Sequence, residues 1–250
     1  MKLLTAIAFL FAAGTAQAQW KTETDLGYVS QSGNATQESA ILSTNLAKTS
    51  GKNTYNVFGT YINTSGEAAG VDAQLAEAAT AGLKYTRTVS KVLGVYSGGL
   101  WEKNRFAGFE NRYSGDLGLR YDVVKNDSMY FFNETGYRYR KQFEYQPGPG
   151  QGDSTESSFA RVYLEAGKKI SKTSSFKLWV ETLYDFDNSD NVEVNFEPSL
   201  DVALGEFLSG DKPVRMSLKV AYKGMYDNVP AAANLKKFDS LLTTGLKVVY

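Results

Sequence analysis

The 250-residue sequence contains no histidine and no cysteine, and only 5 of its residues are proline. Without cysteine the chain can form no disulfide, no thiolate metal site and no cysteine nucleophile. Without histidine it lacks the usual general base near neutral pH and the commonest metal ligand. These absences argue against an enzyme and against a bound cofactor, although a mechanism that uses carboxylates alone stays open.

Net charge is also absent, because 27 Lys and Arg residues balance 27 Asp and Glu residues. No basic run is present, so we expect no nucleic-acid partner, which would require clustered cations. Beyond the first 18 residues no apolar run is long enough for a membrane helix. What is present, 16 Tyr, 14 Phe and 23 Gly among alternating apolar residues, favours strands over helices.

The N-terminus has the pattern of an export signal. Lys2 precedes an apolar stretch over residues 3–13, and Ala16-Gln17-Ala18 follows as a small-x-small cleavage site. We therefore predict a signal peptide over residues 1–18 and a mature domain over residues 19–250. The alternative, an uncleaved membrane anchor, is disfavoured because the apolar stretch is too short.

The mature sequence alternates between apolar and polar residues with a period of two, most clearly over residues 192–204. Such alternation is typical of strands whose two faces meet different solvents. Most segments are long enough to cross a bilayer as tilted strands. The alternation is weaker in two segments, 73–87 and 128–145, where in the second it is disturbed at Asn133 and Thr135. The twelve predicted strands are 20–30, 37–48, 53–64, 73–87, 91–103, 111–124, 128–145, 157–170, 174–187, 191–205, 213–226 and 238–250.

The connections between these segments alternate in length, as in outer-membrane barrels with short turns on one side and long loops on the other. Residues 49–52 and 171–174 are short polar turns, whereas residues 65–72 and 146–156 are predicted to be long loops. Residues 206–212 are long for their side of the barrel. The sequence thus predicts an all-β fold: an antiparallel, transmembrane, up-and-down β-barrel of about 12 strands.

Alternation alone does not say which face points inward. In a membrane barrel the apolar face meets lipid and the charged face lines the lumen, whereas a secreted soluble β-barrel or sandwich has the reverse orientation. The export signal and the aromatic residues near strand ends favour the membrane barrel. The secreted soluble binding protein remains the alternative.

The inward charges suggest a salt-bridge ladder. If segments 191–205 and 213–226 form a hairpin centred on residue 208, oppositely charged residues face each other across it. The predicted pairs are Asp201 with Arg215, Glu197 with Lys219, and Glu193 with Lys223.

The other neighbour of segment 191–205 suggests an acidic cluster in the lumen. A hairpin centred on residue 189 would place Asp185 opposite Glu193 and Glu181 opposite Glu197. Like charges repel unless cations or basic residues compensate them. Two interpretations stay open: a cation site or constriction, or a wall balanced by Arg and Lys from across the barrel.

The last eight residues are predicted to form a strand that ends in an aromatic residue, and they include Gly245, Val248 and Tyr250. This segment looks like the C-terminal signal that the barrel-assembly machinery reads, and it should close the barrel by pairing with the first strand. Residues 24–37, with Ser32-Gly33-Asn34 at their centre, resemble the opening of the salt-induced outer-membrane protein family. Ordinary turn chemistry is the alternative interpretation of these three residues.

The resemblance implies an outer-membrane barrel but no reaction, ligand or catalytic residue. We expect a non-enzymatic envelope protein, either a structural barrel or a narrow channel for small solutes or ions. Its expected partners are outer-membrane lipid and, during biogenesis, the barrel-assembly machinery. An outer-membrane enzyme is the weaker alternative.

Overall fold

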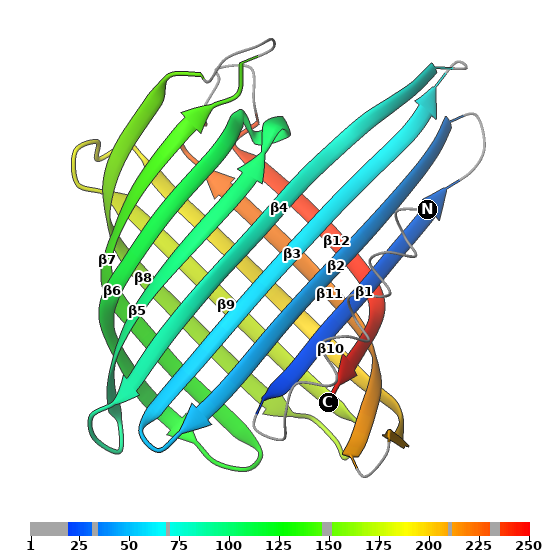
Figure 1. Cartoon of the computed structure of the whole chain (residues 1–250), viewed down its shortest axis with the longest axis vertical. Coiled ribbons are helices and arrows are strands. Elements are labelled where there is room, and N and C mark those ends of the chain that lie inside the picture. The colour runs from blue at the N-terminus through cyan, green and yellow to red at the C-terminus, as the bar shows by residue number, and fades with distance from the viewer. Residues whose placement is uncertain (1–19, 32–34, 69–70, 147–151, 210–211, 231–235) are drawn as a thin grey trace.

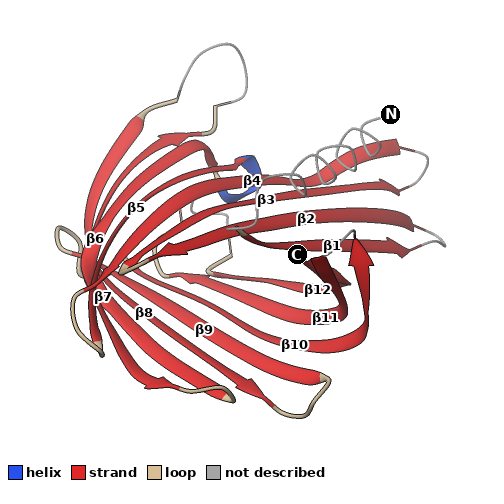
Figure 2. Cartoon of the chain, turned by 60° about the horizontal axis from the view of Figure 1, so that its bottom comes forward, coloured by secondary structure: helices blue, strands red, loops and turns tan. Residues whose placement is uncertain are grey.

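The computed structural model describes residues 20–31, 35–68, 71–146, 152–209, 212–230 and 236–250. Within these residues twelve antiparallel strands form one closed barrel, in which each strand pairs with its neighbours along the chain (Figure 1). Figure 2 shows the same sheet wrapped around a single interior. The predicted all-β, twelve-strand, up-and-down barrel is therefore confirmed.

The strands match the predicted segments closely, with ends that differ by a few residues. One short 3-10 helix, η1 (Arg105–Ala107), interrupts the connection after the fifth strand. In chain order the strands are β1 (Lys21–Gln31), β2 (Ala35–Ser50), β3 (Asn53–Ala68), β4 (Val71–Thr88), β5 (Leu93–Asn104), β6 (Phe109–Lys125), β7 (Met129–Glu144), β8 (Ser154–Lys169), β9 (Ser174–Asp185), β10 (Val192–Ser209), β11 (Lys212–Asp227) and β12 (Phe238–Val249). Among the described residues, no helix is long and apolar enough to cross a membrane.

The barrel closes where β12 pairs with β1, as the sequence predicts. The seam has five direct pairs, from Glu23 with Val249 to Gly27 with Gly245. Because β1 begins and β12 ends at the same rim, we call that rim the terminal end and the opposite rim the loop end. The terminal end lies at the bottom of Figure 1. An even number of strands makes this arrangement necessary.

Two connections differ from their predicted lengths. Strands β3 and β4 stay paired up to Ala68 with Val71, so residues 65–68 and 71–72 belong to the ladder and not to a long loop. Strands β10 and β11 likewise stay paired up to Ser209 with Lys212. In both cases the ladder continues past the end of the clear alternation, because backbone pairing does not require apolar side chains.

The orientation of the side chains is that of a membrane barrel. Leu117 is 65% exposed and Leu83 is 60% exposed on the outer surface, whereas Glu134 is fully buried and Arg138 is 4% exposed in the interior. A closed barrel leaves no unpaired strand edge, and an apolar outer face suits lipid. The chain is thus a barrel of the outer-membrane type, and the alternative of a soluble protein with an apolar core is contradicted.

The disturbed alternation of the seventh segment has a structural explanation. Phe132 is 7% exposed and shares the inward face with Glu134, while Asn133 and Thr135 point outward. A register irregularity between β6 and β7 lies in the neighbouring strand, between Asp122 and Val124. The pattern of β7 is therefore mixed because each of its faces carries residues of both kinds.

Candidate functional site

The interior of the barrel holds the charged side chains, in two groups. The first group extends over the inner face of strands β4 to β9. We call it the central network and define it as Lys84, Asp116, Glu134, Arg138, Arg161 and Glu181, with Tyr96. Its members come from six strands that alternate in direction, and the period-two pattern turns all of them inward.

Arginine side chains connect the central network across the strands. Arg138 donates two parallel hydrogen bonds to Asp116, at 2.7 and 2.8 Å, and its Nη2 lies 3.1 Å from Glu181 Oε1. Arg161 donates from Nε to Glu181 Oε1 at 2.7 Å and from Nη1 to Glu134 Oε2 at 3.2 Å. Lys84 forms an ion pair with Glu134 from the other side. Paired, multiply bonded charges of this kind can be buried without an uncompensated ion.

Tyr96 contacts the central network through its hydroxyl group. Its hydroxyl accepts a hydrogen bond of 3.0 Å from Arg161 Nη1. A Cβ atom on Gly136 would come within 2.7 Å of this hydroxyl, and one on Gly118 within 2.8 Å of the ring. Gly118 and Gly136 lie directly opposite each other on β6 and β7. The two glycines therefore create the space that the tyrosine ring fills.

The second group lies near the closure of the barrel. We call it the seam network and define it as Glu23, Asp25, Glu197, Asp201, Lys219 and Lys247. Lys219 Nζ lies 2.7 Å from Asp25 Oδ2 and 3.7 Å from Glu197 Oε1. Lys247 Nζ lies 3.3 Å from both Glu23 Oε2 and Asp201 Oδ2. The two lysines thus link the first strand to β10 across the closing strands.

The predicted salt-bridge ladder is wrong in its register. Asp201 lies opposite Lys219 and not opposite Arg215, because the β10–β11 hairpin extends further than expected and contains a bulge after Ala203. The shift is four residues, so the inward face is preserved. Glu197 and Lys219 do form an ion pair at 3.7 Å, as part of the seam network.

The other two predicted ladder pairs are replaced by different partners. Asp201 pairs with Lys247, and Arg215 lies 4.0 Å from Glu206 near the terminal rim. Glu193 lies opposite Asp227, and Lys223 lies opposite Leu241 of β12. Glu193 instead pairs with Arg140 of β7, where Arg140 Nη2 lies 3.0 Å from Glu193 Oε2.

The predicted acidic cluster is also altered by the register. Glu181 lies opposite Asn195 and Glu193 opposite Leu183, so the expected like-charge pairs do not face each other. Glu181, Glu193 and Glu197 each have a basic partner. Asp185 accepts hydrogen bonds from Asn191 Nδ2 at 2.8 Å and from the Asp187 amide at 2.9 Å. These contacts are those of a wall balanced by Arg and Lys, and no group of metal-binding carboxylates occurs among the described residues.

The inward face of β2 and β3 differs from the rest of the lumen. It carries no charged side chain between Ser39 and Ala47 on β2 or between Thr54 and Thr64 on β3. Hydroxyl pairs join the two strands, with Ser39 Oγ 3.1 Å from Thr64 Oγ1 and Ser43 Oγ 3.1 Å from Thr60 Oγ1. This part of the wall is uncharged, and its hydroxyl and amide groups alternate with the apolar side chains of Ile41, Phe58 and Ile62.

The C-terminal residues are placed as the closing strand requires. Gly245 lies opposite Gly27, and Val248 lies opposite Thr24. The Tyr250 amide donates to the Thr22 carbonyl at 2.9 Å, which extends the seam by one residue. Residues 1–18 and the Ser32-Gly33-Asn34 motif fall outside the described residues.

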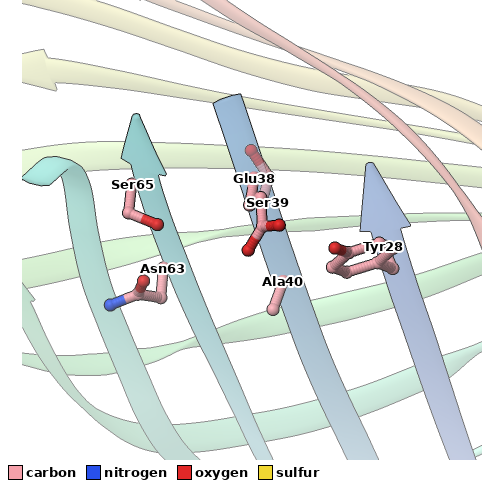
Figure 3. Close-up of a pocket in the computed structure, with 6 residues that line it drawn as sticks. All are labelled: Tyr28, Glu38, Ser39, Ala40, Asn63 and Ser65. Carbon is pink, nitrogen blue, oxygen red and sulfur yellow. The ribbon is translucent and has the colours of Figure 1, made fainter. Parts of the chain in front are cut away.

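A surface groove near the loop end of β1, β2 and β3 carries little chemistry. Its lining is shown in Figure 3 and comprises Tyr28, Glu38, Ser39, Ala40, Asn63 and Ser65. Glu38 is its one ionisable carboxylate, and no basic residue lines it. The lumen is therefore the better candidate for a functional site.

Reasoning from the sequence missed Lys84 and Tyr96 as members of the central network. Lys84 lies in the segment whose alternation begins weakly, and Tyr96 looks like an interface aromatic. The glycines at positions 118 and 136 were the available signal, because strand glycines often mark a close approach of another group.

The sequence of this chain matches a known protein family over most of its length. The family described as "Protein of unknown function, DUF481" matches residues 24–250. The chain belongs to the DUF481 family. The match covers all twelve strands except the first three residues of β1, and the family description assigns no function. No curated protein matches the chain.

Solved structures share the barrel architecture of this DUF481 chain at low identity. The translocator domain of the autotransporter NalP from Neisseria meningitidis is 13% identical, with a TM-score of 0.48 over 100% of this chain and 95% of that one. The NanC porin is 11% identical, with a TM-score of 0.44 over 91% and 97%. The KdgM porin is 10% identical, with a TM-score of 0.43 over 92% and 98%.

Proposed function

We propose that this DUF481 protein is a non-enzymatic, integral protein of the bacterial outer membrane that forms a narrow channel for small solutes or ions. The observation that carries the proposal is the uneven lumen wall. Charged and bulky residues such as Arg138, Arg161 and Tyr163 concentrate on β7 and β8, whereas the inward face of β2 and β3 is uncharged and combines hydroxyl and amide groups with a few apolar side chains, Phe58 among them. A twelve-stranded barrel encloses more space than the eight strands whose interior side chains can fill. Water and small solutes would pass along the uncharged wall.

Weak ion selectivity is expected of such a channel. A strongly selective pore displays a ring of one charge, whereas here the central network pairs its carboxylates with Arg and Lys. The seam network has four carboxylates against two lysines, which favours a slight preference for cations.

Single-channel recording of the refolded mature chain in planar bilayers tests the proposal. We expect small, stable conductance steps with a reversal potential near zero in a salt gradient. Thr60→Trp, which places a large ring on the uncharged wall, should lower the conductance, and Thr182→Trp on the outer face of β9 is the matched control. A barrel that inserts but conducts nothing would instead be a structural scaffold.

The location and biogenesis follow from the same proposal. Residues 1–18 would direct export and be removed, and Gly245, Val248 and Tyr250 would present the last strand to the barrel-assembly machinery. N-terminal sequencing of protein recovered from outer-membrane fractions should begin at Gln19. The resemblance to the salt-induced outer-membrane protein family further predicts that the protein becomes more abundant after a rise in external salt, which immunoblotting can measure.

The non-enzymatic part of the proposal rests on the side chains that the chain offers. It has neither His nor Cys, and the lumen carboxylates Glu134, Glu181 and Glu193 are held in ion pairs with arginine or lysine. A carboxylate held by a guanidinium is a poor general base. Measurable hydrolysis of lipid or peptide substrates that is lost in Glu181→Gln would contradict this part.

A further inference from the structure

The two ends of the barrel differ in charge although the whole chain is neutral. Within the described residues, the exposed acidic residues of the terminal end are Asp127 and Glu206. Seven exposed cations at that end have no carboxylate within 4.0 Å in the part of the chain that the structure describes. They are Lys52, Arg87, Lys91, Lys125, Lys168, Lys169 and Lys172.

The loop end shows the opposite behaviour. There Arg105 Nε lies 2.6 Å from Glu110, and Lys141 Nζ lies 2.8 Å from Glu156. Exposed carboxylates such as Asp187 and Asp190 add negative charge. Among the described residues, the loop end thus keeps only Lys236 and Lys237 as exposed cations without a carboxylate within 4.0 Å, against seven at the terminal end.

The terminal rim is held rigidly by its backbone. Each of three turns accepts a hydrogen bond from the strand that follows its hairpin. These bonds run from the Thr88 amide to the Lys52 carbonyl, from the Asp122 amide to the Val92 carbonyl and from the Lys169 amide to the Ser128 carbonyl, each at 2.8 Å. Side chains cap two of the turns, with Asn126 Oδ1 accepting from the Met129 amide and Ser171 Oγ from the Ser174 amide. A ligand that binds this rim would meet cations whose backbone is already fixed.

Apolar side chains accompany the cations in these turns. Val89 is 52% exposed beside Lys91, and Ile170 is 59% exposed beside Lys172. At the start of β1, Lys48 Nζ lies 5.7 Å from the centre of the Trp20 ring. Side chains at a membrane interface commonly have this arrangement, in which an apolar or aromatic group lies next to the acyl chains and a neighbouring cation reaches the lipid headgroups.

We propose that the terminal rim binds the headgroups of anionic glycerophospholipids. This inference rests on the proposed membrane location and names the lipid class and the surface. Unpaired cations attract a negatively charged leaflet over about a Debye length, and salt screens the attraction. The apolar turn residues would enter the acyl boundary while the lysine and arginine heads contact phosphate. An acidic protein partner would need a complementary folded surface, whereas lipid phosphates surround a rim on all sides.

Tryptophan quenching by brominated lipids tests the proposal with a reporter at each end. The Trp20 reporter carries Trp101→Phe and Trp179→Phe, and the Trp101 reporter carries Trp20→Phe and Trp179→Phe. Each full chain is reconstituted in vesicles that contain brominated phosphatidylglycerol or brominated phosphatidylcholine at equal mole fraction. We expect phosphatidylglycerol to quench Trp20 more strongly, with a relative affinity roughly five-fold higher for each cation in contact, and expect both lipids to quench Trp101 alike.

Charge-removal variants connect the preference to named cations. Lys52→Gln with Arg87→Gln should weaken the preference at Trp20, and high salt should abolish it. Arg105→Gln with Lys237→Gln, a matched loss of two charges at the loop end, should leave it intact. Equal quenching of Trp20 by the two lipids in the unmodified rim would overturn the inference. Quenching by neither lipid would show that the barrel does not enter the bilayer, which overturns the proposed function as well.

Discussion

Arg140 of β7 and Glu193 of β10 form an ion pair that crosses two intervening strands. Arg140 Nη2 lies 3.0 Å from Glu193 Oε2, and the two residues are 6% and 8% exposed. The Arg140 guanidinium also lies 4.6 Å from the centre of the Phe159 ring. The pair therefore connects distant parts of the barrel wall at a place where both side chains are buried.

Removal of one partner of this pair should destabilise the barrel strongly. Glu193→Gln leaves the Arg140 cation buried without its carboxylate, which should lower the free energy of unfolding by about 3–5 kcal/mol. Urea unfolding in vesicles, followed by tryptophan fluorescence, measures this. The exposed pair of Arg215 and Glu206 gives the control, since Glu206→Gln should cost less than about 1 kcal/mol. Arg140→Met combined with Glu193→Leu should recover most of the lost free energy of unfolding. Equal effects of Glu193→Gln and Glu206→Gln would refute the assignment of Arg140 and Glu193 as a buried ion pair.

Aromatic rings packed on glycines provide a second prediction. Phe58 lies directly opposite Gly82, and the nearest atoms to a Cβ built on Gly82 all belong to the Phe58 ring. Gly82→Val should cost about 1–3 kcal/mol by overpacking, and Phe58→Ala should relieve part of that cost in the double variant. Gly99→Ala is the control, because a Cβ atom at position 99 would have no other group within 4 Å. The temperature at which each variant loses its folded band on a gel reports the order of stability. A Gly82→Val variant as stable as the unmodified protein would argue against this packing.

The closure of the barrel can be tested by a disulfide, since the chain has no native cysteine. Thr24 and Val248 lie directly opposite each other across the seam. Their Cα separation in an antiparallel pair is about 4.5–5.5 Å, which a disulfide can span. Thr24→Cys with Val248→Cys should therefore oxidise rapidly in the folded protein, as mass spectrometry would detect.

A displaced cysteine serves as the control for the seam. Thr244 lies four residues away on the same face of β12, so Thr24→Cys with Thr244→Cys places the thiols about 13 Å apart. This variant should stay reduced under the same conditions. Equal oxidation of the two variants would mean that β1 and β12 do not hold the register described.

The number of strands and the face of most charges could be predicted from the sequence, because a period of two determines both. The carboxylate of Glu197 and the ammonium group of Lys219 point inward as predicted, and they meet. The mixed faces of β7 were harder to interpret, since Phe132 lies inside and Asn133 outside. A local pattern cannot show this when lipid-facing and lumen-facing positions each tolerate exceptions.

The partners of the charges could not be predicted, because partner choice depends on register and on contacts across the lumen. A four-residue shift in the β10–β11 hairpin moved Asp201 from Arg215 to Lys219 without any change of face. Arg140 reaches Glu193 over 53 residues of sequence, a separation on which alternation carries no information. The sequence left two interpretations of the acidic cluster open for the same reason, since the arginines that compensate it come from β7 and β8.

The central claim is that apolar side chains face lipid while the polar wall faces a water-filled lumen. Spin labels on single cysteines along β3, at Asn56, Val57, Thr60 and Tyr61, test it most directly in reconstituted vesicles. Val57 and Tyr61 are 46% and 43% exposed on the outer face. The account predicts that oxygen, which partitions into lipid, relaxes labels at Val57 and Tyr61, while a water-soluble nickel chelate relaxes labels at Asn56 and Thr60. The reverse pattern, or no alternation along the strand, would contradict it.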